Sequence, residues 1–234
     1  EALLEFATSA NVCCGEHAGS WELTKSTVEL CKRMGKRYGM HPGYPDRASI
    51  GRRSPTVQDS KEYVDNLFEQ LWRCVAAQPP SYVKPHGAFY NDTATILPSG
   101  WNQVTERSSL SVQLFPETSF LAKLPCGSAL LLMAEVIGCL MGLPGTAHEE
   151  FAKYGQSQFI REGFADRAYR PDGTLVPRSE PGAVLEDPKE IKAQVLELAP
   201  QVDSICLHGD TPDCLEFAEL VYKTLTDNAY EVGY

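Results

Sequence analysis

The sequence predicts an α/β fold built from parallel βα units, in an open sheet or a barrel. Short apolar runs alternate with amphipathic helical segments, and these runs lack strict alternation of apolar and polar residues. Strands buried on both faces have this pattern, because helices cover both sides of a parallel sheet. Histidines also follow several of the runs, where the loops of such a fold carry function. We therefore expect one α/β domain over residues 1–234.

Four segments have the 3.6-residue period of an amphipathic helix. The clearest covers residues 64–75, and Asp59 and Glu62 before it have the spacing of a capping box. The other three cover residues 21–34, 191–198 (after Pro188) and 215–225.

Three short apolar runs between these segments are the expected strands, at residues 82–83, 159–160 and 204–207. A longer apolar stretch, residues 129–143, contains Glu135 and two glycines and is too short to span a membrane, so we expect it to be buried. Residues 93–132 show neither the 3.6-residue period of a helix nor the alternation of a strand. We predict a divergent segment there and assign it no function.

The composition favours an ordinary globular protein. The chain has 234 residues, of which 43% are apolar, and 21 basic side chains against 31 acidic ones give a net charge of −10. A nucleic-acid-binding face needs clustered basic residues, so we expect neither a nucleic-acid partner nor a membrane. The first residues read like the middle of a helix, without a leader, which suggests a fragment. Eight cysteines without a CxxC pair predict reduced, mostly buried thiols in a cytoplasmic protein.

The positions of the histidines are the main functional signal. Four of the five stand in turn-like contexts beside glycine or proline, namely His17, His41, His86 and His208. The loops after the strands of a βα-barrel converge on one rim, so we expect these imidazoles to meet around one pocket. His148, by contrast, is expected to be an ordinary exposed helix residue.

Charged residues accompany the histidines in the same loops. Asp166, Arg178 and Asp210 follow expected strands or lie in nearby loops, and Arg52 follows the loop of His41. Arginines in such loops can bind a carboxylate or a phosphate with two hydrogen bonds. No two of the four loop histidines have the local spacing of a metal-ligand pair, so we predict no metal site.

Five motifs, in order along the chain, resemble the LamB/YcsF family, the A subunit of bacterial-type 5-oxoprolinase. They are residues 9–19 (SANVCCGEHAG), 41–53 (HPGYPD, then GRR), 83–91 (VKPHGAFYN), 162–183 (EGFADRAY, LVPR, then GA) and 206–210 (CLHGD). Three features depart from the family pattern. The initial DLNxDxGEG strand and loop are missing, Glu16 replaces a phenylalanine, and residues 93–132 diverge.

The resemblance implies a distorted TIM-like (β/α) barrel of the glycoside hydrolase/deacetylase type, here with its first strand missing. It also implies ATP-dependent ring opening of the lactam 5-oxo-L-proline to L-glutamate, together with B and C subunits. ATP with Mg²⁺ would be a co-substrate, and no tightly bound cofactor is expected.

The predicted catalytic residues are His41, Lys84, His86, Asp166 and His208. The predicted substrate- and ATP-binding residues are Asn11, His17, Arg52, Arg178 and Asp210. Among them, His41 or His86 would act as acid or base, while Lys84 and Arg178 would bind phosphate or carboxylate. The two aspartates would orient a histidine or bind magnesium.

Two alternatives remain open at this point. A stand-alone metal-dependent amidase or deacetylase on the same barrel would turn over without ATP and be inhibited by chelators. A truncated, non-catalytic remnant would show no turnover even with its partner subunits.

Overall fold

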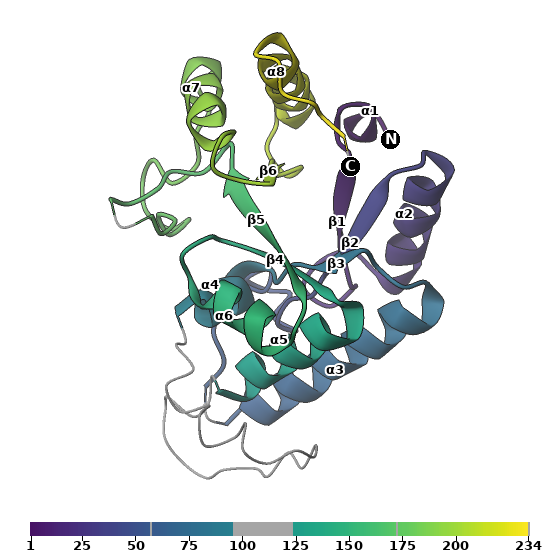
Figure 1. The fold of residues 1–234 in the computed structure, drawn as a ribbon. Helices are drawn as coiled ribbons and strands as arrows, with labels where there is room; N and C mark the ends of the chain where they lie inside the picture. Colours follow the sequence, from purple (N-terminus) through teal and green to yellow (C-terminus); the bar gives the residue numbers. More distant parts are fainter. Residues whose placement is uncertain (57, 96–123, 172, 234) are drawn as a thin grey trace. The chain divides into compact units, whose positions relative to one another are not determined.

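The computed structural model describes residues 1–56, 58–95, 124–171 and 173–233, in which helices and strands alternate along the chain (Figure 1). The helices are α1 (Leu3–Phe6), α2 (Trp21–Arg33), α3 (Ser60–Ala77), α4 (Gly87–Thr95), α5 (Leu124–Ile137), α6 (Ala147–Tyr154), α7 (Pro188–Leu198) and α8 (Cys214–Asp227). The strands are β1 (Ser9–Cys13), β2 (Arg37–His41), β3 (Tyr82–Val83), β4 (Cys139–Gly142), β5 (Gln158–Phe164) and β6 (Ser204–Cys206). The predicted α/β class is confirmed.

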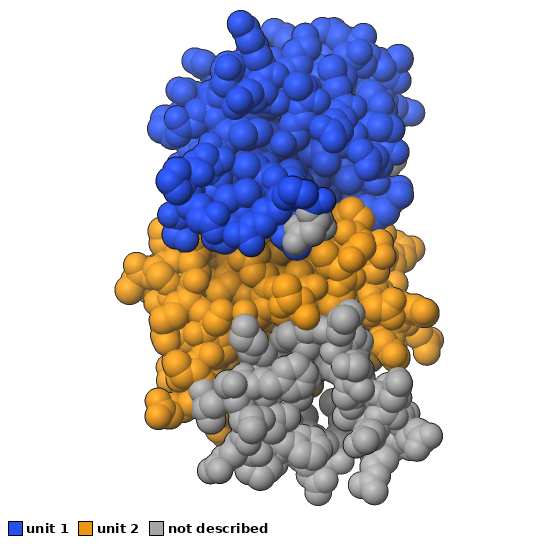
Figure 2. Space-filling model, turned by 90° about the vertical axis from the view of Figure 1, so that its left-hand side faces the viewer, with its two compact units in different colours: residues 1–10, 160–234 blue, residues 11–159 orange. Residues whose placement is uncertain are grey.

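The chain forms two compact units, which Figure 2 colours separately. Unit 1 comprises residues 1–10 and 160–234, and unit 2 comprises residues 11–159.

The sheet of unit 2 has β1, β2, β3 and β4 as neighbours in that order, and β2–β3 and β3–β4 are parallel pairs. Gly39 lies opposite Tyr82, and a Cβ atom at position 39 would overlap the Tyr82 ring, so this strand position requires glycine. Because β2 and β3 are parallel, the loops that follow them leave from the same edge of the sheet. The finer prediction, a TIM-like barrel, stays a prediction.

Helices α3 and α5 pack side by side over the core of unit 2 (Figure 1). Leu67 and Leu71 of α3 and Leu130 and Met133 of α5 are fully buried. The helix predicted at residues 64–75 is therefore confirmed as the central part of α3.

The predicted capping box at the start of α3 is wrong. The Asp59 side chain makes no cap bond to a described backbone N–H of α3. Instead, its carboxylate accepts hydrogen bonds from Arg53 (2.9 Å) and Thr56. The competing partners lie in the loop before the helix, and the spacing of Asp59 and Glu62 could not reveal them.

The apolar stretch at residues 129–143 is buried over most of its length, as predicted, but it is not one element. It forms the end of α5 and then β4, and Gly138 makes the turn between them with a φ of +80°. A positive φ of this size favours glycine, because it has no Cβ.

Unit 1 contains the parallel pair β5–β6, with Gly163 opposite Ile205. Helices α7 and α8 pack together and bury Ile191, Val195 and Phe217, so the helices predicted at residues 191–198 and 215–225 are confirmed. Helix α7 starts at Pro188 itself, since a proline is favourable at the first helical position.

All eight cysteines lie in the described residues and are free thiols, and six of them are buried, as predicted. Among the described helices, none combines the length and apolar character that a membrane span requires. The divergent segment predicted at residues 93–132 lies for the most part outside the described residues.

Candidate active site

Three of the predicted histidines lie together in unit 2. His17 follows β1, His41 ends β2 and His86 follows β3. The His17 and His86 rings stack with centroids 4.0 Å apart, and the His41 ring stands edge-on to His86 at 4.9 Å. The parallel pairing of β2 and β3 explains part of this arrangement, because it carries His41 and His86 to the same edge of the sheet.

The hydrogen bonds of His41 and His86 fix where their protons lie. His41 Nδ1 is 2.7 Å from the carbonyl oxygen of Lys84, and His86 Nε2 is 3.0 Å from the carbonyl oxygen of Ile50. A carbonyl oxygen can only accept, so both of these nitrogens carry a proton. In the neutral rings the other two nitrogens, His41 Nε2 and His86 Nδ1, then present lone pairs to each other across 3.0 Å. The pair therefore has one place for one additional proton.

His17 is held in position by close packing. Its side chain is buried, and neither ring nitrogen has a hydrogen-bond partner among the residues that the structure describes. A Cβ atom at Gly43 would stand 2.5 Å from His17 Nδ1, and one at Gly51 would stand 2.8 Å from His17 Cβ. These two glycines leave the space that the imidazole fills.

The surroundings favour neutral imidazoles. Burial lowers the pKa of His17 to about 3, and the charges of His86, Arg47 and Arg52 contribute in the same direction. Burial also lowers the pKa of His41 well below its usual value, together with the charges of His86 and Lys84. An anion that binds here would oppose these effects, because it offsets the positive charge around the pair.

Other predicted site residues lie in the same unit. The Lys84 side chain is buried, and its backbone N–H donates to the Met40 carbonyl (2.9 Å). Arg52 follows Gly51, where an added Cβ atom would stand 2.8 Å from His17 Cβ and 3.3 Å from Cδ2 of the His86 ring. Asn11, on β1, accepts a hydrogen bond from the Tyr82 hydroxyl (3.0 Å).

The remaining predicted residues form two pairs in unit 1. Both oxygens of the buried Asp166 accept from His208: Nδ1 donates at 2.9 Å and the backbone N–H at 3.1 Å. Burial raises the pKa of Asp166, but the hydrogen bonds and charge of His208 outweigh it, so this pKa lies below its usual value. Arg178 forms an ion pair with Asp210 (3.5 Å). The predicted meeting of His208 with the other three imidazoles stays a prediction, because His208 belongs to unit 1.

Helix α3 contributes a residue that the sequence analysis missed. The buried Gln70 side chain accepts from the Gly43 N–H (3.1 Å) and donates to the Gly43 carbonyl (2.8 Å). It thereby fixes the loop that follows His41. The only indication of this role in the sequence was a polar residue, glutamine, within the apolar stripe that contains Leu67 and Leu71.

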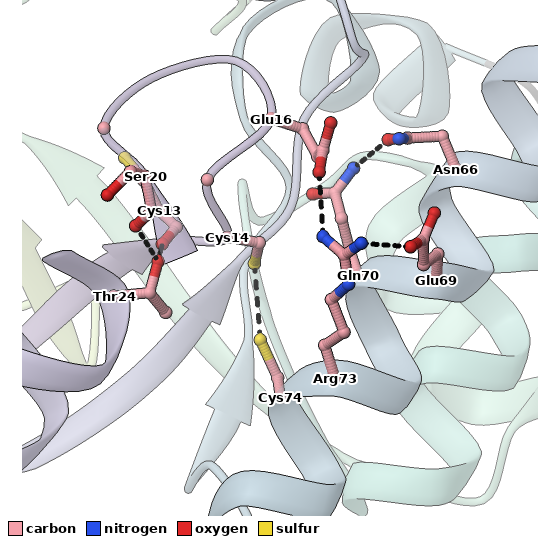
Figure 3. A network of polar contacts seen from close by, with 12 residues as sticks. Cys13, Cys14, Glu16, Ser20, Thr24, Asn66, Glu69, Gln70, Arg73 and Cys74 are labelled. Carbon is pink, nitrogen blue, oxygen red and sulfur yellow. Dashed lines mark hydrogen bonds and ion pairs between the residues drawn. The ribbon is translucent and has the colours of Figure 1, made fainter. Parts of the chain in front are cut away.

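Two arginines, Arg47 and Arg73, also hold the loop that carries His17. Arg47 donates to the carbonyl oxygens of Gly15 (2.7 Å) and Gly19. The Glu16 carboxylate, which departs from the family pattern, forms an ion pair with Arg73 of α3 (3.2 Å; Figure 3). Glu16 is thus bound to the helix.

The prediction for His148 is wrong. It is fully buried on α6, and its Nε2 lies 3.0 Å from the Thr93 hydroxyl oxygen. Ala147, Phe151 and Ala152 are buried on the same helix, so the helical period around residue 148 contained the correct signal.

The described residues also include side chains of the types that can bind a metal ion. Within them, no group of three or more histidine, cysteine, aspartate or glutamate side chains has an arrangement that could hold a metal ion.

A model of the LamB/YcsF family matches residues 1–97 and 128–233. The chain belongs to the LamB/YcsF family. This family member is 34% identical over 250 residues to the 5-oxoprolinase A subunit of Pyrococcus furiosus, covering 99% of this chain and 89% of that protein. It is 35% identical over 244 residues to the 5-oxoprolinase A subunit of Neisseria meningitidis serogroup B, covering 96% of this chain and 89% of that protein.

Structure comparison agrees with the family assignment. The LamB/YcsF chain is similar to the crystal structure of the lactam utilization protein from Thermus thermophilus, with a TM-score of 0.70 and 27% identity. The similarity covers 99% of this chain and 90% of that one. The predicted loss of a first strand stays a prediction.

Proposed function

We propose that this chain acts as the A subunit of a 5-oxoprolinase, which opens the ring of 5-oxo-L-proline to give L-glutamate at the expense of ATP. The family membership and the relatives that carry this name support the proposal. The B and C subunits of such an enzyme would be its partners. The observation in this chain that carries the proposal is the partly buried His41–His86 pair, with its single place for a proton.

The chemistry requires such a proton carrier. A five-membered lactam is a secondary amide, which water attacks slowly. Transfer of a phosphoryl group from ATP to the amide oxygen would release ADP and give an activated imidate, and water would then attack its carbon. Cleavage of the C–N bond would leave an acyl phosphate, whose hydrolysis gives the carboxylate of L-glutamate and inorganic phosphate. The attacking water must lose a proton, and the ring nitrogen must gain one as the C–N bond breaks.

In this proposal the two imidazoles carry that proton. The nitrogens that face each other would take the proton from water and later give it to the leaving nitrogen. Burial, assisted by neighbouring charges that include Lys84, lowers the pKa of His41 and so favours its neutral form before substrate binds. A bound carboxylate or phosphoryl group would offset their charge and favour the protonated pair.

The other predicted residues have roles consistent with this scheme. Lys84 and Arg52 would bind the phosphoryl or carboxylate group. Because both oxygens of Asp166 accept from His208, we assign Asp166 to orienting that imidazole. A TIM-like barrel would bring such residues to one rim. Arg178 would bind an anion, and its partner Asp210 would be available to the Mg²⁺ of ATP.

The test replaces His86 with alanine and measures oxoproline-dependent ATP hydrolysis with the B and C subunits present. Loss of a general acid–base group is expected to lower turnover by about a hundredfold or more. His148→Gln is the matched control, because His148 is a buried histidine outside the imidazole cluster. Near wild-type turnover in the His86→Ala variant would remove the pair from the mechanism. Turnover without ATP, inhibited by chelators, would instead support a metal-dependent amidase.

A second measurement addresses the proton itself. Calorimetric titration of 5-oxoproline in two buffers with different ionisation enthalpies is expected to show proton uptake on binding. The uptake is expected to disappear in His41→Asn, which cannot share a proton with His86. Equal apparent enthalpies in both buffers would contradict the shared-proton arrangement.

A further inference from the structure

Two buried cysteines lie next to each other in unit 2. Cys14 follows β1, Cys74 lies on α3, and their Sγ atoms are 3.6 Å apart (Figure 3). Their exposed fractions are 1% and 5%. A disulfide has an S–S distance of about 2.05 Å, so the sulfur atoms need to approach by about 1.5 Å. Small side-chain and loop adjustments could supply this movement, because both thiols already face each other.

Cys74 can be reached from solvent. It lies at the surface of a pocket of about 350 Å³ between α2, β2 and α3. The pocket is lined by Trp21, Thr24, Lys25, Val28, Glu29, Tyr38, Cys74, Ala77 and Gln78. Cys14 contacts Cys74 but is not among the lining residues. A small oxidant that enters the pocket therefore meets Cys74 first.

The thiol that lines the pocket, Cys74, is also the more acidic of the two. The pKa of Cys74 is lowered, chiefly because the Cys14 thiol can donate a hydrogen bond to its thiolate, and the charge of Arg73 assists against the effect of burial. Burial and the proximity of Cys74 raise the pKa of Cys14 well above its usual value. The accessible thiol is thus the better nucleophile, and the inner thiol is the one that would resolve an oxidised product.

We propose that Cys14 and Cys74 form a site of reversible oxidation, at which a hydroperoxide converts the two thiols into a disulfide. The Cys74 thiolate attacks a peroxide oxygen, the O–O bond breaks, and a sulfenic acid forms with release of water or an alcohol. The Cys14 sulfur then attacks the sulfenic sulfur and gives up its proton, and water leaves. The cysteines lose two electrons, which reduce the peroxide.

The disulfide would act on the imidazole cluster through a short segment of chain. Only Gly15 and Glu16 separate Cys14 from His17, and Glu16 is already bound to Arg73, the neighbour of Cys74. Movement of Cys14 toward α3 would displace His17 from the His86 ring, on which it stacks at 4.0 Å. We therefore expect the oxidised protein to be less active than the reduced one.

The first experiment requires no activity, so it is independent of the proposed function. The full chain is treated with a stoichiometric amount of hydrogen peroxide, its remaining thiols are alkylated, and the unreduced digest is analysed by mass spectrometry. The expected result is a cross-link between the peptides that contain Cys14 and Cys74, which dithiothreitol removes. Cys13→Ser is expected to retain the cross-link, which excludes the adjacent cysteine as the partner. Cys214→Ser, at a partly exposed thiol elsewhere, is the matched control and should also retain it.

Two further variants separate the steps. Cys74→Ser is expected to abolish the cross-link, and Cys14→Ser is expected to accumulate a sulfenic acid at Cys74 that dimedone traps. The proposal is overturned if the wild-type chain forms no cross-link while Cys214 is oxidised, or if the cross-link persists in Cys74→Ser. With the partner subunits present, oxidation should lower oxoproline-dependent ATP hydrolysis by about ten- to a hundredfold, because a displacement of about 1 Å near reacting groups has effects of this size. Unchanged turnover in the cross-linked protein would overturn the coupling to His17.

Discussion

Replacement of Gly43 by alanine tests the packing that holds His17. The added methyl group would stand 2.5 Å from His17 Nδ1 and 2.9 Å from its Cγ. Carbon atoms in favourable contact are about 3.5–4.0 Å apart, so the ring would have to retreat by about 1 Å. It has little room, because His86 stacks on it and Gly51 is so close that an added Cβ there would stand 2.8 Å from His17 Cβ.

The magnitude follows from two opposing effects. Overpacking of a buried site costs about 1–3 kcal/mol, whereas the change from glycine to alanine restricts the unfolded chain and stabilises by about 0.4–1 kcal/mol. Gly43 has no positive φ, so backbone strain does not contribute. We therefore expect the free energy of unfolding to fall by about 1–2 kcal/mol.

Urea unfolding followed by circular dichroism measures this change. Gly233→Ala is the control, because no described atom lies within 4 Å of a Cβ at that position. An unchanged midpoint for Gly43→Ala, or equal shifts in both variants, would refute the close packing of His17 against Gly43.

Three further changes probe the supports of the site. Gln70→Leu leaves the N–H and carbonyl of Gly43 without their buried partner and should lower the free energy of unfolding by about 2–4 kcal/mol in urea titrations; a loss below that range would show that the glutamine is dispensable. Arg73→Ala removes a partly exposed ion pair with Glu16 and should cost less than about 1 kcal/mol in the same assay, so a larger loss would contradict its placement. Burial lowers the pKa of His148 from about 6.5 to about 3. Between these two pH values the unfolded chain binds a proton at this histidine that the folded chain does not bind, so the free energy of unfolding falls as the pH falls. Per pH unit in that window, wild type should lose about 1.4 kcal/mol more than His148→Gln, and parallel pH profiles would contradict this.

The sequence was sufficient for features that depend on local periodicity. The stripe of apolar residues in α3 and the short runs at β3 and β6 identified these elements, because each pattern reflects which face is buried. Asp59 shows the limit of this reasoning. Its side chain had partners in the preceding loop that spacing alone could not distinguish from a helix cap.

The site was predictable to a similar extent. Glycine and proline beside His41 and His86 indicated loops at the edge of a sheet, and the parallel pairing of β2 and β3 brings these two rings together. The contact of Gln70 with Gly43 joins residues 27 positions apart in the chain, and the sequence contains no sign of it beyond a polar residue in an apolar stripe. The proton arrangement also depends on which carbonyl groups the rings reach, which only the fold determines.

Gln70, Arg73 and Cys74 occupy little more than one turn of α3. Gln70 holds the segment after His41, Arg73 holds Glu16, and Cys74 contacts Cys14. The distance between imidazoles therefore depends on a helix that contributes none of them. Any partner protein or ligand that rotates or shifts α3 would move both segments together, and variation in catalytic rate among relatives could arise from substitutions on this helix while every histidine stays the same.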